Sequence, residues 1–181
     1  DNFGIGLTGT VGGSFLYFPF IAAYYYPDQY ASADNTPTQV LWNGSSGVSG
    51  FTLNSDNTAT VSQAGYYKIT YSLQFANSDN AAHDAIVWLR INGVDVARSA
   101  TEFSLPARKS AGVPSLLCAY SEAVFSMTAD DYVELYWATD QAATSGGLLG
   151  VYMYADPAQT VPYARPAIPS AIGSITFVSG T

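Results

Sequence analysis

Residues that could carry out acid–base or nucleophilic chemistry are scarce in this chain. Its 181 residues include one histidine, His83, and one cysteine, Cys118. One histidine cannot form a multi-histidine metal site, and it leaves little room for Ser-His-Asp catalysis. His83 lies in the polar stretch Asn-Ser-Asp-Asn-Ala-Ala-His-Asp at 77–84. This setting predicts a solvent-exposed loop histidine and not a catalytic one.

Cys118 lies in an apolar run, Leu-Leu-Cys-Ala-Tyr at 116–120, without a neighbouring cation that would favour the reactive thiolate. In such a run a free thiol behaves as a small hydrophobic group. We therefore expect a buried, structural Cys118. A lone cysteine also excludes an intrachain disulfide.

Carboxylates are the remaining candidates for chemistry. Asp130 and Asp131 are adjacent, and Asp79 and Asp84 lie in one loop; oxygen ligands of this kind can bind a hard cation. Their spacing matches no calcium-binding loop, which predicts turn residues instead. We expect no catalytic, metal-binding or cofactor-binding residues and no enzyme. The remaining enzymatic hypothesis is hydrolysis of a cell-wall sugar by paired carboxylates.

Composition indicates one folded domain that binds neither nucleic acid nor membrane. The chain is 48 % hydrophobic and 11 % charged, which is too apolar for a disordered chain. Fourteen acidic and six basic residues give a net charge of −8, and a field of that sign repels phosphate backbones. No apolar stretch reaches the roughly 18 residues of a membrane-spanning helix. Aromatic residues make up 14 %, so we expect some of them on a partner-facing surface.

The clearest structural signal is the alternation of residues 65–75, Gly-Tyr-Tyr-Lys-Ile-Thr-Tyr-Ser-Leu-Gln-Phe. In an extended chain, Tyr67 and every second residue after it point to one side, and polar residues point to the other. Such a strand lies between a packed interior and a wetter surface. It therefore predicts one wall of a sandwich or barrel.

Further short strands follow at intervals of about eight to twelve residues, and no helix of useful length is expected. Asn92-Gly93 predicts a tight hairpin because both residues accept positive φ. Pro19 would confine its strand to an edge or a bulge, and the Gly/Ser cluster 43–47 predicts a turn. The pattern predicts an all-β, antiparallel two-sheet jelly-roll sandwich. The other expected strands are residues 15–26, 38–42, 51–53, 58–62, 85–91, 94–98, 116–125, 131–137, 148–154 and 171–178.

Five segments in a fixed order carry a family resemblance. They are Ala-Asp-Asn-Thr-Pro at 33–37, Ala-Gly-Tyr-Tyr-Lys-Ile at 64–69, Val-Trp-Leu-Arg-Ile-Asn-Gly-Val-Asp-Val at 87–96, Asp-Tyr-Val-Glu-Leu-Tyr-Trp at 131–137 and Pro-Ala-Ile-Pro-Ser at 166–170. Together they resemble the jelly-roll domain shared by complement globular heads and tumour-necrosis-factor-like proteins, in the version found in structural proteins of tailed bacteriophages. One departure is position 130, where Asp stands in place of the usual Gly.

The resemblance implies a homotrimer around a threefold axis, with aromatic residues packed between subunits, that serves as a virion surface component. Residues 1–14 would form an N-terminal arm, and residues 15–181 would form the jelly-roll domain. The expected core or trimer-interface residues are Tyr67, Tyr71, Trp88 and Tyr152. The expected anchors of the arm on the capsid are Phe3, Ile5 and Leu7.

Two functions follow from this resemblance as expectations. The first is a trimeric capsid decoration or cement protein, which would sit on the outer capsid surface of a virion and bind the major capsid protein or another virion protein. The alternative is a head-fibre or tail-fibre tip that binds host-surface glycan through exposed Tyr and Trp with Asp and Asn partners, with the loops 77–84 and 106–114 as the sites. Neither function requires a cofactor, nucleic acid or a membrane.

Overall fold

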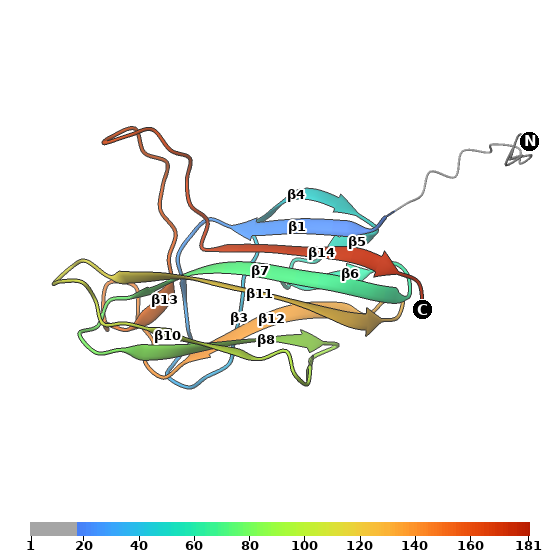
Figure 1. Cartoon of the computed structure of the whole chain (residues 1–181), viewed down its shortest axis with the longest axis horizontal. Coiled ribbons are helices and arrows are strands. Elements are labelled where there is room, and N and C mark those ends of the chain that lie inside the picture. The colour runs from blue at the N-terminus through green and yellow to red at the C-terminus, as the bar shows by residue number, and fades with distance from the viewer. Residues whose placement is uncertain (1–17) are drawn as a thin grey trace, which may run out of the picture.

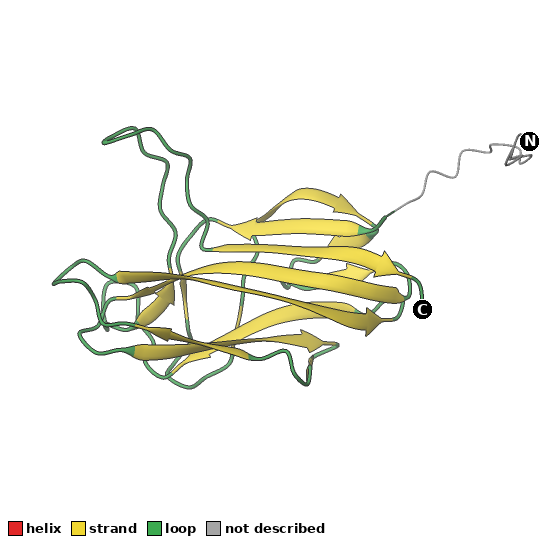
Figure 2. Cartoon of the chain, viewed as in Figure 1, coloured by secondary structure: helices red, strands yellow, loops and turns green. Residues whose placement is uncertain are grey.

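The computed structural model describes residues 18–181 and contains, within that range, strands and loops but no helix (Figure 2). No segment capable of crossing a membrane as a helix occurs in this range either. The strands are β1 (Phe20–Tyr25), β2 (Gln29–Tyr30), β3 (Thr38–Gln39), β4 (Gly44–Ser49), β5 (Phe51–Leu53), β6 (Ala59–Val61), β7 (Gly65–Asn77), β8 (His83–Ile91), β9 (Val94–Asp95), β10 (Thr101–Leu105), β11 (Ser115–Met127), β12 (Tyr132–Thr139), β13 (Val151–Met153) and β14 (Ala171–Ser179).

The strands form two antiparallel sheets. Sheet A has the order β2-β13-β7-β14-β1-β4, and β11 pairs with the free edge of β7 along its full length. Sheet B has the order β10-β8-β12-β6-β5, with β3 and β9 attached to β12 and β8. Figure 1 shows β1, β14, β7 and β11 side by side, with β8 and β12 forming the other layer. The all-β, two-sheet architecture expected from the sequence is thereby confirmed.

The core lies between the sheets and is dominated by the inward side of β7. Tyr67, Leu73 and Phe75 are fully buried, as the alternation of residues 65–75 predicts. The Phe75 ring packs against Trp137 of sheet B with ring centroids 5.4 Å apart. Each large side chain buried in this way contributes roughly 1.5–3 kcal/mol to folding.

Two turns follow the predicted chemistry. Asn92 and Gly93 have φ values of 53° and 75°, and they connect β8 to β9 as a hairpin. Asp130, which stands where the resembling proteins have Gly, has a φ of 68°. Aspartate tolerates the left-handed region better than most residues, so it can occupy this position in the turn before β12.

Three strands, β2, β4 and β10, were not among those expected from the sequence, and one position was misread. Residues 44–49 were expected to begin as a turn but form β4, because Gly44 and Gly47 leave room for the rings of Tyr24 and Phe20 on the neighbouring β1. The strand β10 had no clear sequence signal.

Pro19 lies just before β1, which is an interior strand between β14 and β4, so the edge position, one of the two alternatives predicted, was wrong. The other alternative was a bulge, and β1 has a register shift in its pairing with β4, at Ala22 and Ala23 and not at Pro19.

Candidate interaction surfaces

The outer faces of the two sheets differ in charge. Among the described residues, the seven strands of sheet A contain only two charged side chains, Lys68 and Glu122. Sheet B carries Asp84, Arg90, Asp95, Glu102 and Glu134 in addition to His83. The core between the sheets is apolar, so this difference concerns the surfaces that face outward. Sheet A therefore presents the less charged surface.

A row of exposed apolar side chains runs along β11. Leu116, Tyr120 and Val124 point away from the core and are 51 %, 57 % and 52 % exposed. Within the described chain β11 pairs only with β7, so its other edge is open. The residues that alternate with these apolar ones on the same outer face are Cys118, Glu122 and Ser126. A long edge strand with exposed large apolar side chains is a surface that proteins often cover. We call Leu116, Tyr120 and Val124 the β11 ridge.

Small side chains lie beside the ridge in the middle of the same face. Thr70 and Ser72 of β7 and Ser174 of β14 are adjacent in the ladder, and the hydroxyl groups of Thr70 and Ser174 form a hydrogen bond. Ala22 of β1 continues this row opposite Ser174. We call these four residues the small-residue lane. The large side chains of the ridge thus lie beside small ones on the same face, and Ile172 of β14, opposite Ser72, is 47 % exposed next to them.

The charged residues on this face are paired weakly. Lys68 Nζ lies 3.7 Å from Glu122 Oε2, and about half of each side chain is exposed. The Tyr120 hydroxyl donates to the same carboxylate oxygen at 3.1 Å, and this hydrogen bond raises the pKa of Tyr120. Exposed ion pairs of this kind contribute little to stability.

Cys118 also lies on the outer face of sheet A. Its thiol is exposed and lies 3.2 Å from the Ser72 hydroxyl, so the expected burial was wrong. The apolar neighbours in sequence alternate between the two faces of β11, and Cys118 falls on the outward side with the ridge.

Trp88 lies outside the core, on the outer face of sheet B. Its indole N–H donates to Asp95 Oδ1 at 2.7 Å, and Arg90 Nε donates to the same oxygen at 2.6 Å. The hydrogen bond from Arg90 holds the pKa of Asp95 below its usual range. The Arg90 guanidinium also lies 3.9 Å from the centroid of the Tyr136 ring. Trp88 therefore belongs to a closed polar cluster on the opposite layer from the β11 ridge.

The other three aromatic residues singled out in the sequence have different surroundings. Tyr67 and Tyr71 are 0 % and 5 % exposed and belong to the core. Tyr152 is half-buried and stacks on Tyr30 with centroids 5.4 Å apart; burial, together with the charge of Asp28, raises the pKa of Tyr152 to about 12. A role for these residues in an interface stays a prediction. Phe3, Ile5 and Leu7, and the arm 1–14 that contains them, lie outside the described residues.

His83 is held between two carboxylates, and its side chain is only 11 % exposed. Its Nε2 lies 2.9 Å from Asp79 Oδ2 and its Nδ1 lies 3.0 Å from Asp140 Oδ2. Burial disfavours the charged ring, but hydrogen bonds to Asp79 and Asp140 outweigh it and raise the pKa of His83. Both ring nitrogens can then donate, so His83 ties its loop to the end of β12. The exposed histidine expected from the sequence was a wrong prediction.

The loops 77–84 and 106–114, predicted as glycan sites, lie together. The Arg108 backbone N–H donates to the Asp79 carbonyl at 2.8 Å, and the Asn77 side-chain amide donates to the Pro106 carbonyl at 3.0 Å. Neither loop contains Tyr, Trp or Phe. The Tyr and Trp contacts expected for sugar binding therefore do not come from these two loops, and sugar binding there stays a prediction that depends on polar contacts.

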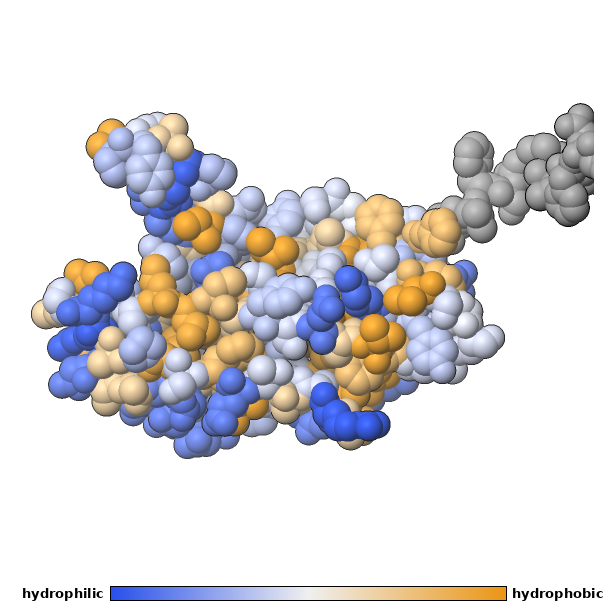
Figure 3. All heavy atoms as spheres, in the orientation of Figure 1, coloured by the Kyte–Doolittle hydropathy of each residue, from blue (hydrophilic) through white to orange (hydrophobic). Residues whose placement is uncertain are grey.

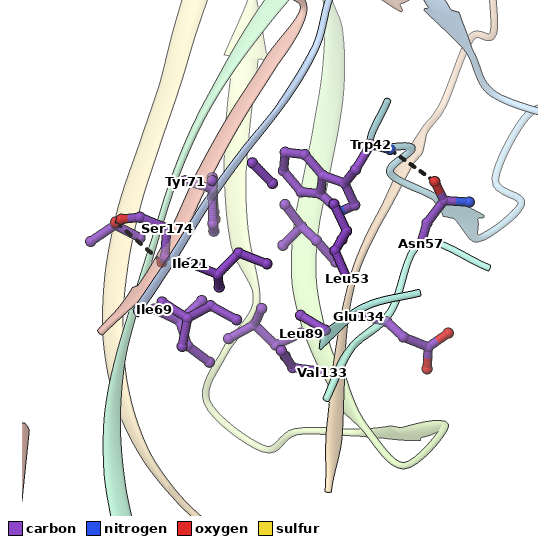
Figure 4. Close-up of a pocket in the computed structure, with 16 residues that line it drawn as sticks. Ile21, Trp42, Leu53, Asn57, Ile69, Tyr71, Leu89, Val133, Glu134 and Ser174 are labelled. Carbon is purple, nitrogen blue, oxygen red and sulfur yellow. Dashed lines mark hydrogen bonds between the residues drawn. The ribbon is translucent and has the colours of Figure 1, made fainter. Parts of the chain in front are cut away.

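The cavity between the sheets is small and apolar (Figure 4). It has a volume of about 50 Å³ and is lined by Ile21, Ile69 and Val133 among others. Trp42 packs against Gly173 on one side of it, and the Trp42 backbone N–H donates to Asn57 Oδ1 at 2.9 Å. Ligand pockets usually measure roughly 300–1,000 Å³, so this space is a packing gap in the core. Among residues 18–181, no three His, Cys, Asp or Glu side chains are grouped as a metal site would require.

Comparisons with known proteins bear on the fold. No protein-family model matches the chain, and no curated protein matches it. Among solved structures, the chain is similar to the Eiger TNF of S. frugiperda, with 13 % sequence identity and a TM-score of 0.51 over 90 % of this chain and 95 % of that one. At this identity the likeness concerns the fold alone. Together with the two antiparallel sheets, it shows that the chain has the tumour-necrosis-factor-like jelly-roll fold that the sequence predicts.

Proposed function

We propose that this protein is a virion structural protein, a homotrimeric decoration or cement protein that binds the outer capsid surface of a tailed bacteriophage. The observation that supports self-association is the outer face of sheet A, where the β11 ridge lies beside the small-residue lane. The capsid location is proposed from the family resemblance of the sequence motifs.

The ridge and the lane suit a contact between identical copies. The ridge consists of large apolar side chains, and the lane consists of small ones that leave room for them. When the ridge of one copy packs on the lane of the next, each copy uses two different patches, and a threefold rotation closes such a contact into a ring. The near absence of charge on this face favours its burial, because few ions would lose their hydration.

The experiment has two arms, which separate the assembly from the attachment. Light scattering on the purified chain measures its mass over a range of concentrations, and we expect three times the chain mass of 19.2 kDa. Rebinding to particles stripped of the protein then compares the full chain with a chain lacking residues 1–14. We expect the truncated chain to remain trimeric but to lose its place on the particle.

Different results would contradict different parts of the proposal. A chain that stays monomeric at high concentration contradicts the trimer. Normal occupancy of the particle by the truncated chain contradicts anchoring by the arm. Failure of the full chain to bind capsids, combined with retention on host envelopes, would favour the fibre-tip alternative.

A further inference from the structure

Residues 155–168 form an arm that projects from the body between β13 and β14 (Figure 1). Two antiparallel bridges join its two halves. Asp156 and Ile168 exchange backbone hydrogen bonds of 3.0 and 2.7 Å, and Gln159 and Arg165 exchange bonds of 3.1 and 2.9 Å. The arm is therefore a paired stalk with a tip at 160–164.

The stalk is stiffened by Arg165. This side chain forms an ion pair with Asp156, and the two side chains are 17 % and 19 % exposed. The Arg165 guanidinium also donates to the carbonyl groups of Pro157 and Pro166 at 3.2 and 3.1 Å. Fixed proline φ angles further limit the backbone. An arm ordered in this way loses little conformational entropy when it binds.

The tip is apolar and stands clear of the body. Val161 is 79 % exposed and Tyr163 is 67 % exposed, with Pro162 between them. Figure 3 shows the apolar group at the end of the arm and hydrophilic groups along its stalk. A tyrosine on a rigid support is a typical anchor of a protein interface. In this chain, the stalk holds the tip away from the body, so the tip lacks a covering surface of its own.

A hollow lined mainly by apolar side chains, which suits the apolar tip, lies at the foot of the arm. It has a volume of about 500 Å³, within the range of pockets that accept a group the size of a few side chains. Its walls are mostly apolar, and two carboxylates also line it, those of Asp28 and of Asp156, the latter being paired with Arg165. The residues that line it include Tyr26, Pro27, Asp28, Ala155, Pro157 and Ala167.

We propose that the arm of one copy inserts Pro162 and Tyr163 into the hollow at the foot of the arm of a second copy. The apolar ring and proline match the apolar walls. The Tyr163 hydroxyl would donate to Asp28, whose carboxylate already accepts the Ala155 backbone N–H at 2.7 Å and the Tyr30 hydroxyl at 3.3 Å. A carboxylate has room for about four hydrogen bonds, so Asp28 retains acceptor capacity.

A second copy fits this contact better than a different protein, because both halves of the contact are present on this one chain. Tip and hollow are different patches, so the contact is head-to-tail, and a threefold rotation closes it. The inference rests on the proposed trimer and adds to it a second contact between neighbouring subunits.

Disulfide trapping between two differently tagged versions of the chain tests the contact, with Cys118→Ser in both. One version carries Ala164→Cys, which probes the tip and keeps Tyr163. The other carries Ala167→Cys in the wall of the hollow. The matched control replaces Ala167→Cys by Val94→Cys, at an exposed position on β9. The two versions are co-expressed and oxidised, and the linked heterodimer is quantified.

We expect the disulfide from position 164 to position 167 to form at least about tenfold faster than the disulfide from position 164 to position 94, because docking raises the effective concentration of the tip thiol near position 167. Adding Tyr163→Ser to the tip version should remove this preference. Equal coupling to both positions, or coupling that Tyr163→Ser leaves unchanged, would overturn the docking. The mass of the wild-type chain separates the two proposals. If the chain is a trimer but no preferred disulfide forms between positions 164 and 167, only the arm contact is contradicted. If the chain is a monomer, the trimer itself is contradicted.

Discussion

Val124 of β11 lies directly opposite Lys68 of β7 in the antiparallel register. An exposed apolar side chain thus lies beside Lys68, the one cation in the strands of sheet A within residues 18–181, on the face that we propose to be covered by a second copy.

Val124→Glu is expected to separate assembly from folding. In the monomer the new carboxylate would remain hydrated beside Lys68, whereas in an assembly it would lose its hydration, and Lys68, which already pairs with Glu122, would offset only part of that cost. We expect the dissociation free energy to fall by about 2 kcal/mol or more, roughly thirtyfold in the dissociation constant. Sedimentation or light scattering against concentration measures this change. The matched control is Val94→Glu on β9, and an equal loss of mass in both variants would speak against the ridge.

Cys118 offers an independent probe of the same face, because its exposed thiol lies between the ridge residues Leu116 and Tyr120. We expect a maleimide reagent to label Cys118 slowly in the wild-type chain and at least about tenfold faster in Val124→Glu, because buried thiols are inert. The labelling rate is followed by mass spectrometry. Rapid labelling of wild-type chain at concentrations where it is fully assembled would mean that another surface forms the contact.

Two glycines are expected to respond differently to alanine. At Gly150, with φ at 159°, a Cβ atom would come 2.6 Å from the Gln141 carbonyl oxygen, which belongs to the backbone and cannot move freely. At Gly112, with φ at 76°, nothing lies within 4 Å of such an atom. We expect Gly112→Ala to cost about 1 kcal/mol through its φ alone, and Gly150→Ala to cost about 3 kcal/mol through overlap and strain. Chemical unfolding at one protein concentration compares them, and equal costs would contradict the close packing at Gly150.

The contribution of His83 to stability should depend on pH. Because the folded-state pKa of His83 is raised, its contribution is complete below the unfolded value of about 6.5 and is lost as the pH rises through the folded pKa. The pKa values of Asp79 and Asp140 are lowered in the folded state, so these carboxylates contribute to stability above their unfolded pKa values. Their contribution is lost at acidic pH, as the pH falls through the folded pKa values. We expect the melting temperature of the wild-type chain to exceed that of His83→Gln most at about pH 5–6. This advantage should shrink above pH 7. A difference that does not change with pH would mean that the ring is neutral.

Local patterns in the sequence predicted those parts of the fold in which neighbouring residues decide the conformation. The alternation of residues 65–75 determined β7 and its inward side, and Asn92-Gly93 determined a hairpin, because side-chain direction and φ preference are local properties. The strand β4 was missed for the opposite reason. Its Gly and Ser residues favour a turn by themselves, and only the rings of Tyr24 and Phe20 on β1 explain why Gly44 and Gly47 form a strand.

The candidate surfaces depended on contacts between distant segments. His83 is 57 residues from Asp140 in sequence and bonded to it in space, so a polar loop motif could not reveal its burial. Cys118 was misplaced because an apolar run does not say which face of a strand points inward. Trp88 lies outside the core, and its place in an interface stays a prediction. The sequence by itself determined an all-β chain whose strands have one apolar and one polar side, because the alternation of apolar and polar side chains is a property of neighbouring residues. Only the tertiary structure decided which outer face is nearly free of charge and where the arm and its hollow lie, since both follow from how strands far apart in the chain pair and stack.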